Sequence, residues 1–128
     1  MLIVDDEERI LVAVGEYFDF QGYDVACAHD LPEAKALLDG RDYAVVIADL
    51  RLTGIDASDG LELVTYARAR NAATKILLLT AYGTPDVVAE AYRRGADAFL
   101  AKPHPLPDLA QLVIALLTAD RIKGRTNS

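Results

Sequence analysis

The sequence predicts a single α/β domain in which a parallel sheet of five strands is covered by five helices. Short runs rich in β-branched and apolar residues alternate with longer segments whose apolar residues recur every three or four positions. Several of the short runs contain no alternating polar residues, which is typical of strands buried on both faces. The chain has 128 residues, 52% of them hydrophobic and 26% charged, so it can bury one core and fold by itself.

The expected elements alternate along the whole chain. Five runs are predicted to be strands: residues 2–4, 24–28, 44–48, 76–79 and 98–101. The segments between them are predicted to be helices: residues 7–21, 31–39, 61–70, 86–94 and 107–121. Right-handed crossovers between successive strands would place helices on both faces of the sheet.

Glycine and proline mark several of the predicted helix ends. Gly22, Gly40 and Gly95 follow three of the helices, where a residue in the left-handed region closes the last turn without a Cβ clash. Thr84 followed by Pro85 has the order of an N-cap and a first-turn proline. These signals agree with the periodicity, and we therefore expect helix boundaries at these positions.

The charge and cysteine content narrow the classes of function. Thirteen Lys and Arg against twenty Asp and Glu give a net charge of −7, which disfavours binding to nucleic acid or to an acidic membrane surface. No apolar run is long enough for a membrane span or resembles a signal peptide. The single cysteine, Cys27, cannot form an intrachain disulfide and is expected to be a small buried residue. We therefore expect a cytoplasmic domain.

Polar residues stand at the ends of the predicted strands. The first strand is followed by Asp5 and Asp6, the third by Asp49, the fourth by Thr80 and the fifth by Lys102. Ligands of an open parallel sheet bind outside the carboxyl ends of its strands. We therefore expect these side chains to converge on one edge of the sheet although they are scattered along the chain.

This set of residues points to phosphoryl transfer. Three carboxylates brought together would repel each other unless a cation lay between them. Oxygen ligands and a small, hydrated site favour Mg²⁺ over Ca²⁺, and no cluster of Cys or His offers a site for zinc. A lysine and a hydroxyl could bind phosphoryl oxygens while a carboxylate accepts the phosphoryl group.

The same residues carry a resemblance to a known family. The chain resembles the receiver domain of two-component response regulators over nearly its whole length. The matching motifs are LIVDDE at residues 2–7, VIADLRLTG at 46–54, LLLTAYG at 77–83 and AFLAKP at 98–103. The resemblance implies a flavodoxin-like, doubly wound sheet with strand order 2-1-3-4-5. It assigns residues 1–122 to the receiver domain and leaves residues 123–128 as a disordered polar tail.

The resemblance also implies an acceptor and a metal site. Asp49 would be the phosphoacceptor. Asp6 and Asp49 would bind Mg²⁺ directly, Asp5 would bind it through water, and the backbone carbonyl of Arg51 would supply another oxygen. Mn²⁺ is an alternative ion for the same oxygen ligands.

The other positions that match the family's motifs would bind the phosphoryl group and respond to it. Lys102 and Thr80 would contact phosphoryl oxygens, and the N–H of Ala81 would be a further donor. A cis bond between Lys102 and Pro103 would aim the lysine inward. Thr80 and Phe99 would form the switch that changes the face made by the fourth helix, the fifth strand and the fifth helix.

Two features depart from the commonest family pattern. Arg51 and Tyr82 stand two residues after Asp49 and Thr80, where family members tune the access of water to the acyl phosphate. Both side chains are large, and we expect slow hydrolysis. Gly60 stands eleven residues after Asp49, which indicates a longer loop after the third strand than is usual in the family.

The resemblance implies a signalling module rather than an enzyme that turns over an external substrate. It would take a phosphoryl group from a histidine kinase or phosphotransfer domain that docks on the first helix. The face around the fifth strand would then contact an output partner or a second copy. We expect the domain itself to bind neither nucleic acid nor membrane.

The same residues allow other interpretations. Asp5 and Asp6 could merely cap the first helix, and a pseudo-receiver would keep the fold without phosphorylation. An aspartyl-phosphate phosphatase would need a second Asp where Arg51 stands. A flavin or nucleotide carrier would need Gly, Ser or Thr after the first strand, where acidic residues would repel phosphate.

Overall fold

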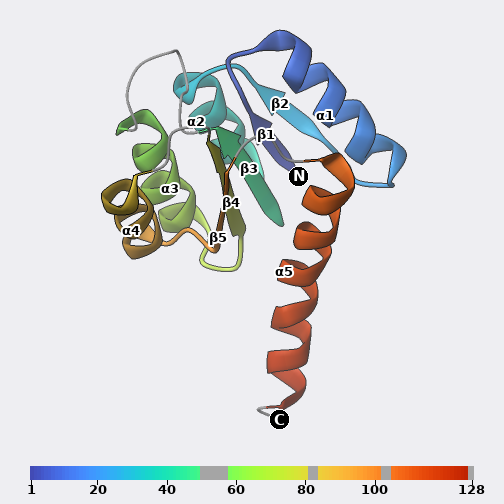
Figure 1. Cartoon of the computed structure of the whole chain (residues 1–128), viewed down its shortest axis with the longest axis vertical. Coiled ribbons are helices and arrows are strands. Elements are labelled where there is room, and N and C mark those ends of the chain that lie inside the picture. Colours follow the sequence, from blue (N-terminus) through green and yellow to red (C-terminus); the bar gives the residue numbers. More distant parts are fainter. Residues whose placement is uncertain (50–57, 81–83, 102–104, 127–128) are drawn as a thin grey trace.

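The five predicted strands form one parallel sheet. The computed structural model describes residues 1–49, 58–80, 84–101 and 105–126. Among these residues, the strands pair in the order β2-β1-β3-β4-β5 (Figure 1), which confirms the predicted topology. The strands are β1 (Leu2–Val4), β2 (Ala26–Ala28), β3 (Val45–Asp49), β4 (Lys75–Thr80) and β5 (Ala98–Ala101).

Helices cover both faces of the sheet, as Figure 1 shows. Apolar residues of α1 and α5 pack together on one face, and those of α2, α3 and α4 pack on the other. The helices are α1 (Glu8–Phe20), α2 (Leu31–Gly40), α3 (Ser58–Arg70), α4 (Pro85–Arg94) and α5 (Leu106–Thr126). Within the described residues, no helix combines the length and apolar character that a membrane crossing requires.

The central strand β3 shows why two helical layers are needed. All five of its residues are buried. Val46 and Ala48 belong to the core on the side of α2, α3 and α4, whereas Val45 and Ile47 belong to the core on the side of α1 and α5. Successive side chains of a strand point to opposite faces, so an apolar strand without polar alternation must be covered on both sides.

Local signals placed several helix ends correctly. The hydroxyl of Thr84 accepts a hydrogen bond from the N–H of Val87 (3.3 Å), with proline at the start of α4. Gly22 and Gly95 have φ angles of 99° and 120°, as expected for residues that close a helix. The prediction for Gly40 was wrong, because α2 includes it as its last helical residue. A glycine tolerates the left-handed region but does not require it.

The last helix is longer than the sequence indicated. α5 ends at Thr126, so residues 123–126 are helical rather than coil, and residues 127–128 lie outside the described part. A polar composition does not stop a helix, because Arg and Lys are good helix formers and an existing helix propagates residue by residue. Figure 1 shows the end of α5 projecting beyond the sheet.

One arginine forms several hydrogen bonds at the amino-terminal edge of the sheet. Arg68 of α3 donates hydrogen bonds to the carbonyl oxygens of Ala72, Thr74 and Gly95 at 2.7, 2.8 and 2.7 Å. It also donates to Oδ2 of Asp97 (2.8 Å), which accepts a second hydrogen bond from the N–H of Ile76 (2.8 Å). Arg68 thus joins the end of α3 to the loops before β4 and β5.

Replacing Asp97 with alanine should destabilise the domain. The substitution leaves a partly buried guanidinium without its carboxylate and the N–H of Ile76 without its acceptor. We expect the free energy of unfolding, measured with urea, to fall by about 2 to 3 kcal/mol. Asp42→Ala, at an exposed position, is the matched control and should change it by less than about 0.5 kcal/mol. Equal effects of the two substitutions would contradict the role given to Asp97.

Candidate functional site at the carboxyl edge of the sheet

The register of the strands brings distant residues to one edge. Val4 of β1 lies opposite Ala48 of β3, and Asp49 lies opposite Leu79 of β4. Thr80 at the end of β4 lies opposite Ala101 at the end of β5. Parallel strands end at the same edge of a sheet. Asp5, Asp49 and the backbone of Thr80 therefore lie at this edge, while Lys102 lies outside the described residues.

Asp5 follows β1 and is held in place by the backbone around it. Only 4% of the residue is exposed. Its N–H donates to the carbonyl oxygen of Ala28 (3.1 Å), and its Oδ1 accepts from the N–H of Glu7 (2.9 Å). The carboxylate therefore helps to start α1, whose N-cap residue Glu7 forms no side-chain cap. The capping interpretation is in part correct for Asp5.

Asp49 is the most deeply buried acidic residue of this edge, with 2% of its surface exposed. It ends β3, one residue beyond the Val4–Ala48 pair, and so stands beside Asp5 in the sheet. The alternation of side chains places both acids on the face covered by α1 and α5. Two neighbouring buried carboxylates repel each other, and a cation between them removes this repulsion.

Asp6 differs from the other two acids because it is exposed. Within residues 1–49, 58–80, 84–101 and 105–126, no group of three or more His, Cys, Asp or Glu side chains is arranged to hold a metal ion. The pair Asp5 and Asp49 is nonetheless a suitable donor set for Mg²⁺, which typically takes one or two carboxylates and keeps several waters.

The remaining predicted site residues are placed only in part. The backbone of Thr80 ends β4. Phe99 of β5 lies opposite Leu78 and packs, partly buried, against the core on the side of α2, α3 and α4. The other predicted residues lie outside the described part of the chain: Arg51, Ala81, Tyr82, Lys102 and Pro103.

A histidine after β2 links two of the helices that begin near this edge. The ring of His29, which follows β2, contacts the carboxylate of Glu8 from α1 through Nε2 and that of Glu33 from α2 through Nδ1 (3.0 Å). The backbone N–H of His29 also donates to Glu33 Oε1 (2.6 Å). The hydrogen bonds that the ring donates to the carboxylates of Glu8 and Glu33 raise the pKa of His29 above its usual value. The four-residue spacing of His29 and Glu33 was the one sequence signal for this cluster.

The geometry defines a doubly wound α/β domain with an acidic site at the carboxyl edge of its sheet. The family model of the response regulator receiver domain matches residues 1–114. The chain therefore belongs to the response regulator receiver domain family, which confirms the resemblance seen in its motifs.

Relatives and solved structures agree with this membership. The transcriptional regulatory protein PmrA of Pectobacterium parmentieri is 35% identical over 128 residues, which is all of this chain and 55% of PmrA. The chain thus spans about half the length of that relative. A CheY-like receiver domain protein from Methanospirillum hungatei has a TM-score of 0.88 and 26% identity, with 95% of both chains covered.

A further solved structure has the same fold and contains a modified aspartate. It is a response regulator from Burkholderia pseudomallei with a phosphorylated aspartic acid, a calcium ion and citrate. Its TM-score is 0.82 at 24% identity, and the match covers 99% of this chain and 73% of that one. At this identity the comparison shows the shared fold alone.

The cluster around His29 should make stability depend on pH. Because the folded-state pKa is raised, the stabilisation is fully present below the unfolded-state pKa of about 6.5 and is lost as the pH rises through the folded-state pKa. We expect His29→Gln to reduce the free energy of unfolding at a pH of about 5.5 but to have little effect at a pH of about 9.

Histidine NMR titration provides the direct measurement. The pKa of His29 should lie above about 6.5, a typical value for histidine, and should fall in Glu8→Gln and Glu33→Gln. The other histidine, His104, serves as an internal control and should not respond to either substitution. An unchanged His29 titration in both variants would rule out the cluster in solution.

Proposed function

We propose that this domain receives a phosphoryl group on Asp49 and passes a signal by changing its protein contacts. The observation that carries the proposal is the position of Asp49, buried at the carboxyl end of β3 and next to Asp5. Membership of the receiver family supports the assignment. The carboxyl edge is also where ligands of open parallel sheets bind.

The proposed reaction is a simple displacement at phosphorus. A carboxylate oxygen of Asp49 forms a new bond to the phosphorus of a phosphohistidine, and the bond from phosphorus to the imidazole nitrogen breaks. The electron pair of that bond stays on the imidazole, which takes a proton from solvent. The product is an acyl phosphate on Asp49 and a free histidine on the donor.

Asp5 and Asp49 provide oxygen ligands that suit Mg²⁺, with Asp6 and the carbonyl of Arg51 as the further ligands that the family implies. Receiver domains bind a divalent metal. When bound, the ion would neutralise charge on the phosphoryl oxygens. Asp5 is positioned for this role by the N–H of Glu7, which fixes the direction of its carboxylate.

Thr80, the N–H of Ala81 and Lys102 would bind the phosphoryl oxygens. The motion of Thr80 toward the new anion would then be transmitted through Phe99 to the face made by α4, β5 and α5. The packing of α4 supports this step, because Ala91 is its one buried residue. A helix with so little buried surface can be displaced at low cost.

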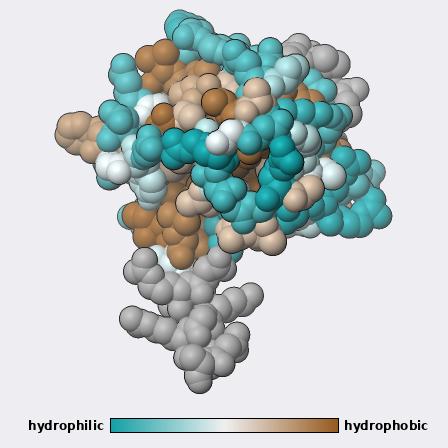
Figure 2. Space-filling model, turned by 180° about the vertical axis from the view of Figure 1, so that it is seen from behind, coloured by the Kyte–Doolittle hydropathy of each residue, from teal (hydrophilic) through white to brown (hydrophobic). Residues whose placement is uncertain are grey.

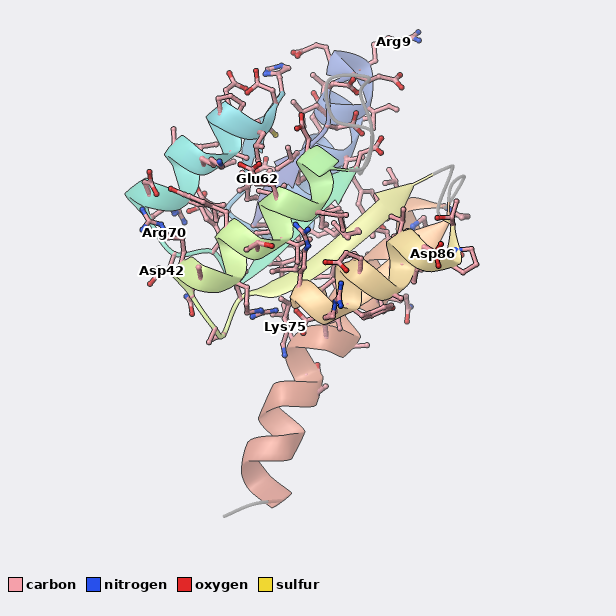
Figure 3. All side chains as sticks on the ribbon, turned by 90° about the vertical axis from the view of Figure 1, so that its left-hand side faces the viewer. Arg9, Asp42, Glu62, Arg70, Lys75 and Asp86 are labelled. Carbon is pink, nitrogen blue, oxygen red and sulfur yellow. The ribbon has the colours of Figure 1, made fainter. Side chains whose placement is uncertain are left out.

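Receiver domains interact with histidine kinases and form dimers, and we propose that this domain does both. The donor would dock along α1, which begins beside Asp5 and Asp6 and whose first residues include Arg9, directed away from the body in Figure 3. The output partner or second copy would contact the face of α4, β5 and α5. In this role the domain catalyses its own modification and turns over no external substrate.

Acetyl phosphate with Mg²⁺ should add one phosphoryl group to the intact protein. We expect the adduct, detected by intact mass, to be absent in Asp49→Asn because the acceptor oxygen is lost, and to require Mg²⁺. Asp5→Asn should slow its formation by about tenfold or more, since it removes one negative charge beside the proposed ion site. Asp42→Asn, an exposed acid well away from the acidic edge in Figure 3, should behave like the parent protein.

The alternatives predict different outcomes in the same measurement. If the domain were a pseudo-receiver, neither the parent protein nor Asp49→Asn would form an adduct. An adduct that persists in Asp49→Asn would place the acceptor elsewhere and overturn the proposal.

The acyl phosphate should be long-lived because the large side chains of Arg51 and Tyr82 would exclude water from the in-line position. We expect Arg51→Ala and Tyr82→Gly each to shorten its half-life several-fold, measured by the decay of the adduct after removal of acetyl phosphate. Arg70→Ala, an exposed arginine of α3, is the control and should leave the half-life unchanged. A half-life that neither Arg51→Ala nor Tyr82→Gly shortens would show that these side chains do not control access.

A further inference from the structure

A groove lies between α1 and the edge strand β2, apart from the acidic edge. Its volume is about 320 Å³, and it is lined by residues from three turns of α1 and from the segment that contains β2: Leu11, Val12, Gly15, Glu16, Asp19, Val25 and Cys27. Its length along α1, from Leu11 to Asp19, is about 12 Å at roughly 1.5 Å per residue. This size suits a few residues of another protein chain.

The floor of the groove is apolar and closely packed. Val12 is 46% exposed although it is a large aliphatic residue. A Cβ at position 15 would lie 3.2 Å from Sγ of Cys27, so glycine lets the thiol rest against α1. Cys27 is exposed, and the prediction that it is buried was wrong. It lies on an edge strand, whose outer side no neighbouring strand covers among the described residues.

The rim of the groove is acidic. Glu16 and Asp19 line it, and none of its lining residues is a lysine or an arginine. Burial raises the pKa of the Cys27 thiol, and the charge of Glu8 at the start of α1 raises it further. An apolar floor with an acidic rim complements a segment that carries both aliphatic and basic side chains.

The backbone of β2 adds a second recognition element. The N–H of Ala26 donates to the carbonyl oxygen of Met1 (2.9 Å), and the carbonyl oxygen of Ala28 accepts from the N–H of Asp5 (3.1 Å). Residues 26 and 28 thus turn their backbone groups toward β1. In a strand the next residue turns them the other way, so the N–H and C=O of Cys27 face outward at the sheet edge.

We propose that this groove binds an extended, basic segment of a partner protein. The segment would pair with the backbone of Cys27 at the edge of β2, place an aliphatic side chain on the exposed Val12, and set Lys or Arg against Glu16 and Asp19. None of these residues belongs to the phosphoacceptor site. The groove shares α1 with the proposed donor-docking surface but contains none of the proposed acceptor residues, and its test requires no phosphorylation.

Cys27 is the one cysteine of the sequence and lines the groove. The amount of disulfide that a peptide forms with it therefore measures binding in the groove. The probes are three hexapeptides that each begin with cysteine and glycine. The first continues with leucine, valine and two arginines, and the second with leucine, valine and two glutamates. The third continues with two serines and two arginines. Each peptide is supplied as its mixed disulfide with β-mercaptoethanol and is equilibrated with the protein in excess β-mercaptoethanol. Thiol–disulfide exchange transfers the peptide to Cys27 and releases β-mercaptoethanol, and the protein–peptide disulfide is quantified by intact mass. We expect the leucine-valine-arginine peptide to be captured about tenfold more than either of the others, from one apolar contact and two exposed ion pairs.

Charge variants separate the groove from the general acidity of the chain. Glu16→Gln with Asp19→Asn should remove most of the preference for arginine over glutamate. Asp42→Asn with Asp86→Asn changes the net charge equally at exposed positions outside the groove and should leave that preference in place. Val12→Ser should remove the preference for leucine and valine over serine.

Three results would overturn the proposal. They are equal capture of the three peptides, an equal loss of preference in both pairs of charge variants, and an unaltered preference in Val12→Ser. Circular dichroism of each variant establishes that the fold is retained. Loss of phosphorylation in Asp49→Asn with unchanged peptide capture would show that the groove and the phosphoacceptor site are independent.

Discussion

The register of the parallel sheet is the constraint on which the candidate site depends. Backbone hydrogen bonds fix Val4 beside Ala48 and Asp49 beside Leu79, and the strand ends follow from these pairs. A shift of β3 by one residue would reverse the faces to which its side chains point. Asp49 would then turn away from Asp5, and the core side chains would exchange layers. The apolar layers on the two faces therefore determine where the acids meet.

The two edges of the sheet differ in how their charged groups are paired. At the amino-terminal edge, Arg68 and Asp97 satisfy one another and several backbone groups, and Thr74 donates to the carbonyl oxygen of Tyr43 (2.6 Å). At the carboxyl edge, Asp5 and Asp49 are both acids and are both buried. Similar charges placed together favour a cation and an incoming electrophile, whereas the matched groups of the other edge only stabilise the fold.

Surfaces available to partners follow from the same packing. Figure 2 shows apolar surface on the far side of the molecule just above the end of α5, and Ile114 of that helix is 55% exposed. α1 buries Leu11, Val14 and Phe18, which leaves its two flanks for different contacts. The first turn of α1 follows the acidic edge, and one flank of the helix forms the groove with β2.

The sequence by itself determined the elements and their order, because apolar periodicity, the Thr84 cap and the glycines at positions 22 and 95 act over a few residues. It also placed the acids at strand ends, since that required only the strand limits. The tertiary structure alone decided that Cys27 is exposed, that Asp49 is buried beside Asp5, and that Glu8 reaches His29. These outcomes depend on which strand forms the edge and which helix packs against it, and such choices arise from contacts between residues far apart in the chain.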